Sequence, residues 1–175
     1  MASTAGDVQP LIELAQYHND ASDGLSYFLS DRFRNKDLRF LGLTPAEFQD
    51  LVSTRIDETE LRSSLAMLAL LEAKLRIDFR TRVKQRRKDP LSKAFRSFGK
   101  QSGQKIRFDD LLDLWSLHHP RFRRILSEFR ATLHLRHWLA HGRYWEKPSH
   151  GRFDYFAIYS LSEVILTAFP LLSDN

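Results

Sequence analysis

Apolar side chains recur along this chain at intervals of three and four residues, the spacing of one face of an α-helix. No stretch alternates between apolar and polar residues over several pairs, as a half-buried strand would. The pattern therefore predicts an all-α fold, a single bundle of five to six helices. We expect helices over residues 10–18, 25–33, 58–86, 108–118, 120–141 and 155–169, and a further helix starting at Thr44 and Pro45.

Length and composition indicate one globular domain over residues 1–175, with residues 1–9 as a loose N-terminal tail. The longest apolar run, residues 65–71, falls short of the roughly 20 residues that a membrane span needs. The first residues also lack the apolar stretch of a signal peptide. The chain has no Cys, which excludes disulfides, thiolate metal sites and a cysteine nucleophile. We expect a cytoplasmic protein without a membrane partner.

Two charged residues interrupt the apolar stripes of the two longest predicted helices. Glu72 lies within the stripe of helix 58–86, and Arg136 lies within that of helix 120–141. A buried charge is costly unless it is paired, and Arg can bind a carboxylate through two parallel hydrogen bonds. We therefore predict that Glu72 and Arg136 lie near each other inside the bundle. A purely structural ion pair would also satisfy this pattern.

Six of the seven histidines lie between residues 118 and 150. His134, His137 and His141 share one flank of the predicted helix 120–141, next to Arg136. Histidines at such spacing can bind zinc, but this helix offers no further ligand nearer than Glu128, and two arginines lie on the same flank. We expect no metal and no cofactor. Arg and His without a metal suit a polyanion, because Arg neutralises phosphate and His transfers protons near neutral pH.

The positive charge is concentrated in one segment. Residues 80–107 contain eleven Lys or Arg and one acid, Asp89, so they carry +10 in a chain whose net charge is +5. We predict that residues 84–106 form a basic, partly flexible segment that binds an RNA backbone. A solvated helix end followed by a flexible loop is the alternative. The candidate RNA-binding residues are Lys84, Arg86, Arg87, Lys88, Lys93, Arg96, Lys100 and Lys105.

Two large apolar residues near the end of helix 120–141 do not fit its core stripe. Leu135 and Trp138 are predicted to project away from the core, so they need a cover. The last helix, 155–169, is apolar over most of its circumference and could supply that cover within the chain or contact a second subunit. The sequence favours neither alternative.

The stretch from Arg136 to His141, RHWLAH, resembles the R-x4-H signature of the HEPN superfamily, the higher eukaryotes and prokaryotes nucleotide-binding domains. The helical layout of residues 58–169 is also similar, with Glu72 on a long helix that precedes the motif. The resemblance implies a compact helical bundle and, for much of the superfamily, a metal-independent ribonuclease that acts as a toxin or phage-defence effector. It also implies a homodimer with a composite active site in which two motifs meet.

The resemblance implies roles for the residues of the motif. His141 is the expected general acid or base, Arg136 the residue that stabilises phosphoryl charge, and His137 a second candidate for proton transfer. Glu72, His134 and Tyr144 are expected to support them. One branch of the superfamily, paired with an antitoxin, has a Tyr two residues after the motif His; here Arg143 takes that place and Tyr144 follows.

The sequence thus leads to two functional hypotheses. The first is a metal-independent endoribonuclease whose partners are RNA, a second copy of the chain and an antitoxin or regulatory protein. The alternative is a non-catalytic module of the same fold that binds nucleotides, RNA or protein.

Overall fold

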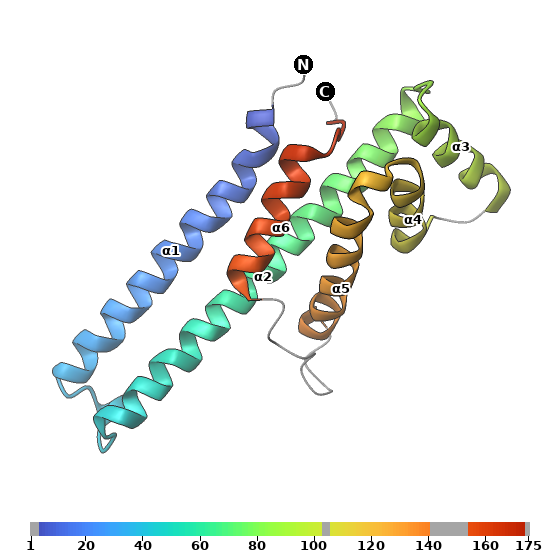
Figure 1. Ribbon diagram of the computed structural model, residues 1–175. Helices are drawn as coiled ribbons and strands as arrows, with labels where there is room; N and C mark the ends of the chain where they lie inside the picture. The colour runs from blue at the N-terminus through green and yellow to red at the C-terminus, as the bar shows by residue number, and fades with distance from the viewer. Residues whose placement is uncertain (1–3, 103–105, 141–153, 174–175) are drawn as a thin grey trace.

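The computed structural model describes residues 4–102, 106–140 and 154–173 (Figure 1). These residues form six α-helices and two short 3-10 helices, and no strand occurs among them, which confirms the all-α prediction. The elements in chain order are α1 (Thr4–Arg34), η1 (Leu38–Phe40), α2 (Pro45–Lys84), α3 (Pro90–Ser102), α4 (Phe108–His118), η2 (Pro120–Phe122), α5 (Arg123–Ala140) and α6 (Tyr155–Ala168).

One continuous helix, α1, spans residues 4–9 of the predicted tail and takes the place of the two short helices predicted after it; residues 1–3 lie outside the described residues. His18, at the predicted break, is buried, with its Nδ1 3.0 Å from the Ser63 hydroxyl of α2. The His18 ring also stacks on the Tyr155 ring of α6. These contacts fix α1 to two other helices just before Gly24, so packing outweighs the roughly 1 kcal/mol that a helical Gly costs relative to Ala.

The second helix, α2, begins at Pro45 as predicted but continues unbroken to Lys84, a length of about 60 Å. Thr44 and Glu47 form a capping box at its start, in which each side chain accepts a hydrogen bond from the other residue's backbone N–H. The sequence predicts a separate helix that begins near residue 58. Because no Gly or Pro occurs between Pro45 and Pro90, the helix is not interrupted at that point. In Figure 1, α1 and α2 lie side by side as a long antiparallel hairpin.

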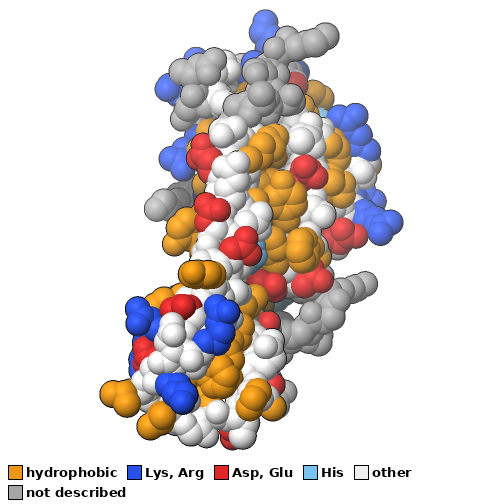
Figure 2. All heavy atoms as spheres, turned by 90° about the vertical axis from the view of Figure 1, so that its left-hand side faces the viewer, with side chains coloured by type: hydrophobic (Ala, Val, Ile, Leu, Met, Phe, Trp, Pro, Cys, Tyr) orange, Lys and Arg blue, Asp and Glu red, His pale blue; other side chains and the backbone are white. Residues whose placement is uncertain are grey.

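The turn of this hairpin has a small core of its own, in which Leu29, Phe40 and Phe48 are buried. Phe48 stacks on Phe33 and meets Phe40 edge to face. Figure 2 shows hydrophobic and basic side chains gathered at this end of the molecule. The exposed apolar residues there are Tyr27, Phe28, Leu38 and Leu41.

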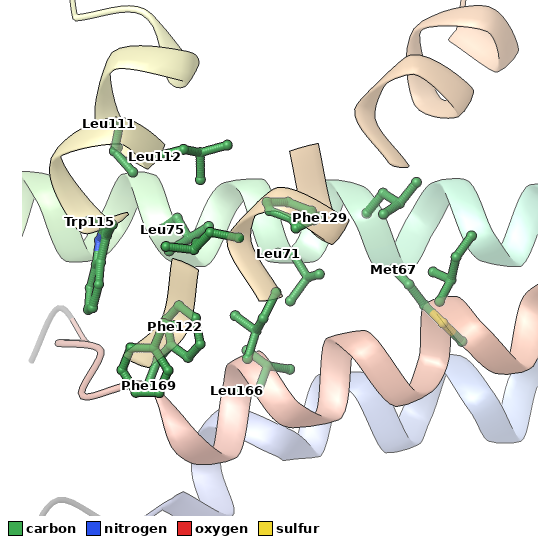
Figure 3. Packing of buried hydrophobic residues seen from close by; sticks show 14 of the residues in the cluster. Met67, Leu71, Leu75, Leu111, Leu112, Trp115, Phe122, Phe129, Leu166 and Phe169 are labelled. Carbon is green, nitrogen blue, oxygen red and sulfur yellow. The ribbon is translucent and has the colours of Figure 1, made fainter. Parts of the chain in front are cut away.

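The main core lies at the other end of the hairpin, where all six helices contribute buried side chains. Figure 3 shows part of this cluster. Leu71 and Leu75 of α2 pack in the cluster that contains Trp115 of α4 and Phe129 of α5. Phe122 stacks on Phe169 at the end of α6, with ring centroids 3.9 Å apart. This packing holds α2 and α5 against each other and so positions Glu72 and Arg136.

The helix α3 occupies most of the segment 84–106, which the sequence predicted to be basic and partly flexible. Leu91 and Phe95 are buried in the main core, and Phe95 meets Phe79 of α2 edge to face. The few apolar residues of this stretch, at helical spacing, form one core-facing stripe between the cations. Residues 103–105 lie outside the described residues, so partial flexibility of the segment stays a prediction.

A buried ion-pair network fixes the end of α2 to the C-terminal segment. Arg82, 5% exposed, donates through Nε to both carboxylate oxygens of Asp78, through NH1 to Asp89 and through NH2 to the Pro170 carbonyl. The Leu172 N–H donates to Asp78. Burial raises the pKa of Asp78 to about 6, although Arg82 and the Leu172 N–H act in the opposite direction. Removing Arg82 would therefore leave a buried carboxylate unpaired.

The apolar residues expected to face away from the core are buried within the chain. Leu135 and Trp138 are 3% and 5% exposed and belong to the same cluster as Tyr155 and Ile158 of α6. The last helix packs on α1, α2 and α5, so the cover comes from the chain itself. Of the two covers that the sequence left open, the one within the chain is therefore present, and α5 is buried on more than one side. None of the helices in the described part of the chain combines the length and apolar composition needed to cross a lipid bilayer.

Candidate functional site

The predicted pair of Glu72 and Arg136 is present. Arg136 NH2 of α5 lies 3.0 Å from Glu72 Oε2 of α2, which confirms the pairing. The Glu72 side chain is 15% exposed, whereas the Arg136 side chain is 38% exposed. The carboxylate is therefore mostly enclosed between the two helices, while part of the guanidinium faces solvent. An Arg held in this way can contact a ligand outside the bundle.

A second arginine, which the sequence analysis missed, binds the same carboxylate. Arg76 Nε donates to Glu72 Oε1 at 2.9 Å, and the Arg76 side chain is 37% exposed. Glu72 thus joins one arginine from its own helix to one from α5, and the three residues carry a net charge of +1. The only sequence signal for Arg76 is its position four residues after Glu72, a spacing shared by many surface pairs.

An aromatic pair lies beneath this arginine and connects three helices. The guanidinium carbon of Arg76 lies 4.9 Å from the centroid of the Phe108 ring of α4. Phe108 in turn meets Phe129 of α5 edge to face, with centroids 6.0 Å apart. Phe129 is fully buried, so Arg76 rests on a rigid part of the core and keeps its orientation.

The histidines of the motif flank Arg136 along α5. His134 and His137 are both exposed. His141 and Tyr144, the other predicted site residues of this region, lie outside the described residues. The structure therefore brings together Glu72 and Arg136 and adds Arg76 to them. The role of His141 rests on the sequence alone.

The predicted RNA-binding residues lie mainly at the C-terminal end of α2 and directly after it. Lys84, Arg86, Arg87, Lys88 and Lys93 are exposed, and Arg96 is half-buried. The side chain of Lys100, and Lys105 as a whole, lie outside the described residues. Glu72 and Lys84 are about 18 Å apart along the axis of α2, at 1.5 Å per residue. These cations can contact an RNA strand only well away from the Glu72 carboxylate.

A second basic surface lies at the start of α5, where a groove of about 810 Å³ separates it from α6. Arg121, Arg123 and Arg124 line this groove. Arg124 is paired with Glu128, and the Arg121 guanidinium lies over the Phe122 ring. This groove lies outside residues 84–106, for which the sequence predicts binding of the RNA backbone.

Among the described residues, no group of three or more His, Asp or Glu side chains is arranged to hold a metal ion. His141 and His150 are outside this set. The expectation that the site needs no metal therefore stays a prediction.

No family model, no curated protein and no solved structure matches this chain significantly. The resemblance to the HEPN superfamily therefore rests on the motif from Arg136 to His141 and on the helical layout.

Proposed function

We propose that this protein is a metal-independent endoribonuclease of the HEPN type. The observation that carries the proposal is the ion pair between Glu72 and Arg136, which holds the motif arginine at the surface of the bundle. A purely structural pair of this kind needs no exposed guanidinium. Here more than a third of the Arg136 side chain is open to solvent, as contact with a phosphoryl group requires.

In the proposed reaction, a ribose 2′-hydroxyl attacks the adjacent phosphorus and the bond from phosphorus to the 5′ oxygen breaks. His141 removes the proton from the 2′-hydroxyl or delivers one to the leaving 5′ oxygen, and His137 is the candidate for the other transfer. Arg136 stabilises the charge that develops on the phosphoryl oxygens. The products are a 2′,3′-cyclic phosphate and a 5′-hydroxyl, and no redox step is involved.

The proposal includes further partners. The exposed cations at the end of α2 would hold the RNA strand away from the point of cleavage, with a strong dependence on salt. A homodimer with a composite site, and an antitoxin or other regulatory protein, are proposed from the resemblance alone. The two apolar residues that had suggested a subunit contact, Leu135 and Trp138, are buried within the chain.

The test is cleavage of a mixed-sequence RNA by the purified protein in the presence of EDTA. We expect fragments ending in a 2′,3′-cyclic phosphate, and no cleavage of the same sequence with 2′-deoxyriboses. An Arg136→Ala variant should lose about 100-fold or more of the rate, as is usual when a group that stabilises transition-state charge is removed. Complete loss of wild-type activity in EDTA would contradict the proposal. A folded wild-type protein that binds RNA and cleaves none would favour the non-catalytic binding module.

A further inference from the structure

The two arginines on the Glu72 carboxylate are arranged alike. Arg76 contacts one carboxylate oxygen and Arg136 the other, at 2.9 Å and 3.0 Å. Their side chains are 37% and 38% exposed, while the carboxylate between them is largely enclosed. Glu72 therefore contacts two guanidinium groups that are both partly exposed at the surface.

Toward the described part of the chain, both arginines retain hydrogen-bonding capacity. There, Arg76 donates through Nε alone, and Arg136 contacts Glu72 through NH2. Arg82, on the same helix, differs because its Nε, NH1 and NH2 all donate to protein acceptors and its side chain is buried. A guanidinium has five N–H donors, so Arg76 and Arg136 can each offer several to a ligand.

The charge of this cluster indicates the class of ligand. Two guanidiniums and one carboxylate leave a net charge of +1, which one phosphodiester of charge −1 neutralises. Arg binds phosphate through two parallel N–H donors, and two neighbouring arginines can contact different oxygens of the same group. Phe108 beneath Arg76 limits the movement of that guanidinium and favours a fixed geometry.

We propose that Arg76 and Arg136 together bind one phosphodiester group of a single-stranded RNA, with Glu72 positioning both guanidiniums. This assigns a ligand-binding role to Arg76, which lies outside the motif. The inference rests on the proposed function for the choice of RNA as the ligand, but it concerns binding and is measurable without cleavage.

The experiment uses a fluorescein-labelled, mixed-sequence oligonucleotide with 2′-O-methyl riboses, which cannot undergo 2′-hydroxyl attack. Its affinity for the full-length protein is measured by fluorescence anisotropy, and cleavage of the unmodified RNA is measured in parallel. The variants are Arg76→Gln, Arg76→Lys and Arg136→Gln. The matched control is Arg62→Gln, because Arg62 Nε donates to Glu58 at 3.1 Å with the same four-residue spacing on α2.

We expect Arg76→Gln and Arg136→Gln each to weaken binding about 10-fold, the size of one lost charge-assisted contact. Arg76→Lys keeps the charge without the planar donors and should fall between the wild type and Arg76→Gln. Arg62→Gln should stay within 2-fold of the wild type. Thermal unfolding of each variant establishes that it is folded.

Each outcome bears separately on the two proposals. Binding that Arg76→Gln leaves unchanged overturns the inference, and so does a wild-type protein that does not bind the probe. Loss of binding in Arg76→Gln by a protein that cleaves no RNA supports the phosphodiester site and contradicts the endoribonuclease. If wild type and Arg76→Gln cleave RNA at equal rates and bind the probe with equal affinities, the endoribonuclease is supported and the phosphodiester site is contradicted.

Discussion

Replacing Glu72 by Gln tests whether one carboxylate holds the two arginines. The change keeps the size of the side chain and removes its charge, so Arg76 and Arg136 lose their shared partner. Two unit charges 4 Å apart interact by about 4 kcal/mol at an effective dielectric constant of about 20. Both arginines are more than a third exposed, and exposed pairs are worth only about 0.2–1 kcal/mol.

Because the Glu72 side chain itself is mostly buried, we place each of its pairs near the top of that range, at about 1 kcal/mol. Glu72→Gln should then lower the free energy of unfolding by about 2 kcal/mol. For a chain of this size that corresponds to a fall of roughly 4–8 °C in Tm.

The assay is a double-mutant cycle by urea unfolding with Glu72→Gln, Arg136→Gln and the double variant. The double variant should be about 1 kcal/mol more stable than the sum of the single changes predicts. The control cycle uses Glu58 and Arg62, whose pair is more exposed and should couple by about 0.3–0.5 kcal/mol. A coupling free energy between Glu72 and Arg136 no larger than that of the control pair would show that Glu72 does not hold Arg136 in place.

Three further predictions concern other parts of the chain. Arg82→Ala should lower the free energy of unfolding by about 3–5 kcal/mol in urea titrations, because it leaves Asp78 buried and unpaired; a loss below 1 kcal/mol would contradict this. Burial acts to raise the pKa of Asp89, but its hydrogen bonds from Ser92 and the charge of Arg82 outweigh it and lower that pKa. The stability that Asp89 contributes is therefore present above about pH 4 and is lost as pH falls through the lowered pKa. Asp89→Asn should make the free energy of unfolding depend less on pH in this acid range, and an unchanged pH dependence would contradict the prediction. Replacing Arg86, Arg87 and Lys88 together by Ala should weaken RNA binding and reduce the salt slope by about 2 on a log–log plot, while cleavage at saturating RNA persists; an unchanged slope would exclude this segment from binding.

Much of the fold could be predicted from local patterns. The start of α2 at Pro45, the whole of α4 and the start of α6 after Asp154 follow from capping residues and helical spacing, which act over a few positions. The continuity of α1 could not be predicted in this way. It depends on the contacts of His18 with Ser63 and Tyr155, which are distant in the sequence.

The site was predictable to a similar extent. Glu72 and Arg136 each interrupt an apolar stripe, so both could be placed toward the core, and opposite charges then made a pair the natural solution. Arg76 could not be singled out, because the same four-residue spacing joins Glu58 to the exposed Arg62. The cover of Leu135 and Trp138 could not be assigned from the sequence, because a helical projection shows that two apolar residues lie outside the main stripe but not which segment packs on them.

The most direct test of the proposed RNA cleavage is inducible expression of the wild type beside His141→Ala, with the integrity of cellular RNA followed by gel electrophoresis. We predict that the wild type fragments RNA and that His141→Ala, expressed at the same level, fragments it at least about 100-fold more slowly, because proton transfer by a positioned His typically contributes 10²–10⁴-fold. Equal fragmentation by the two proteins, or intact RNA with both, would contradict the assignment of His141 as the proton-transferring residue of an endoribonuclease.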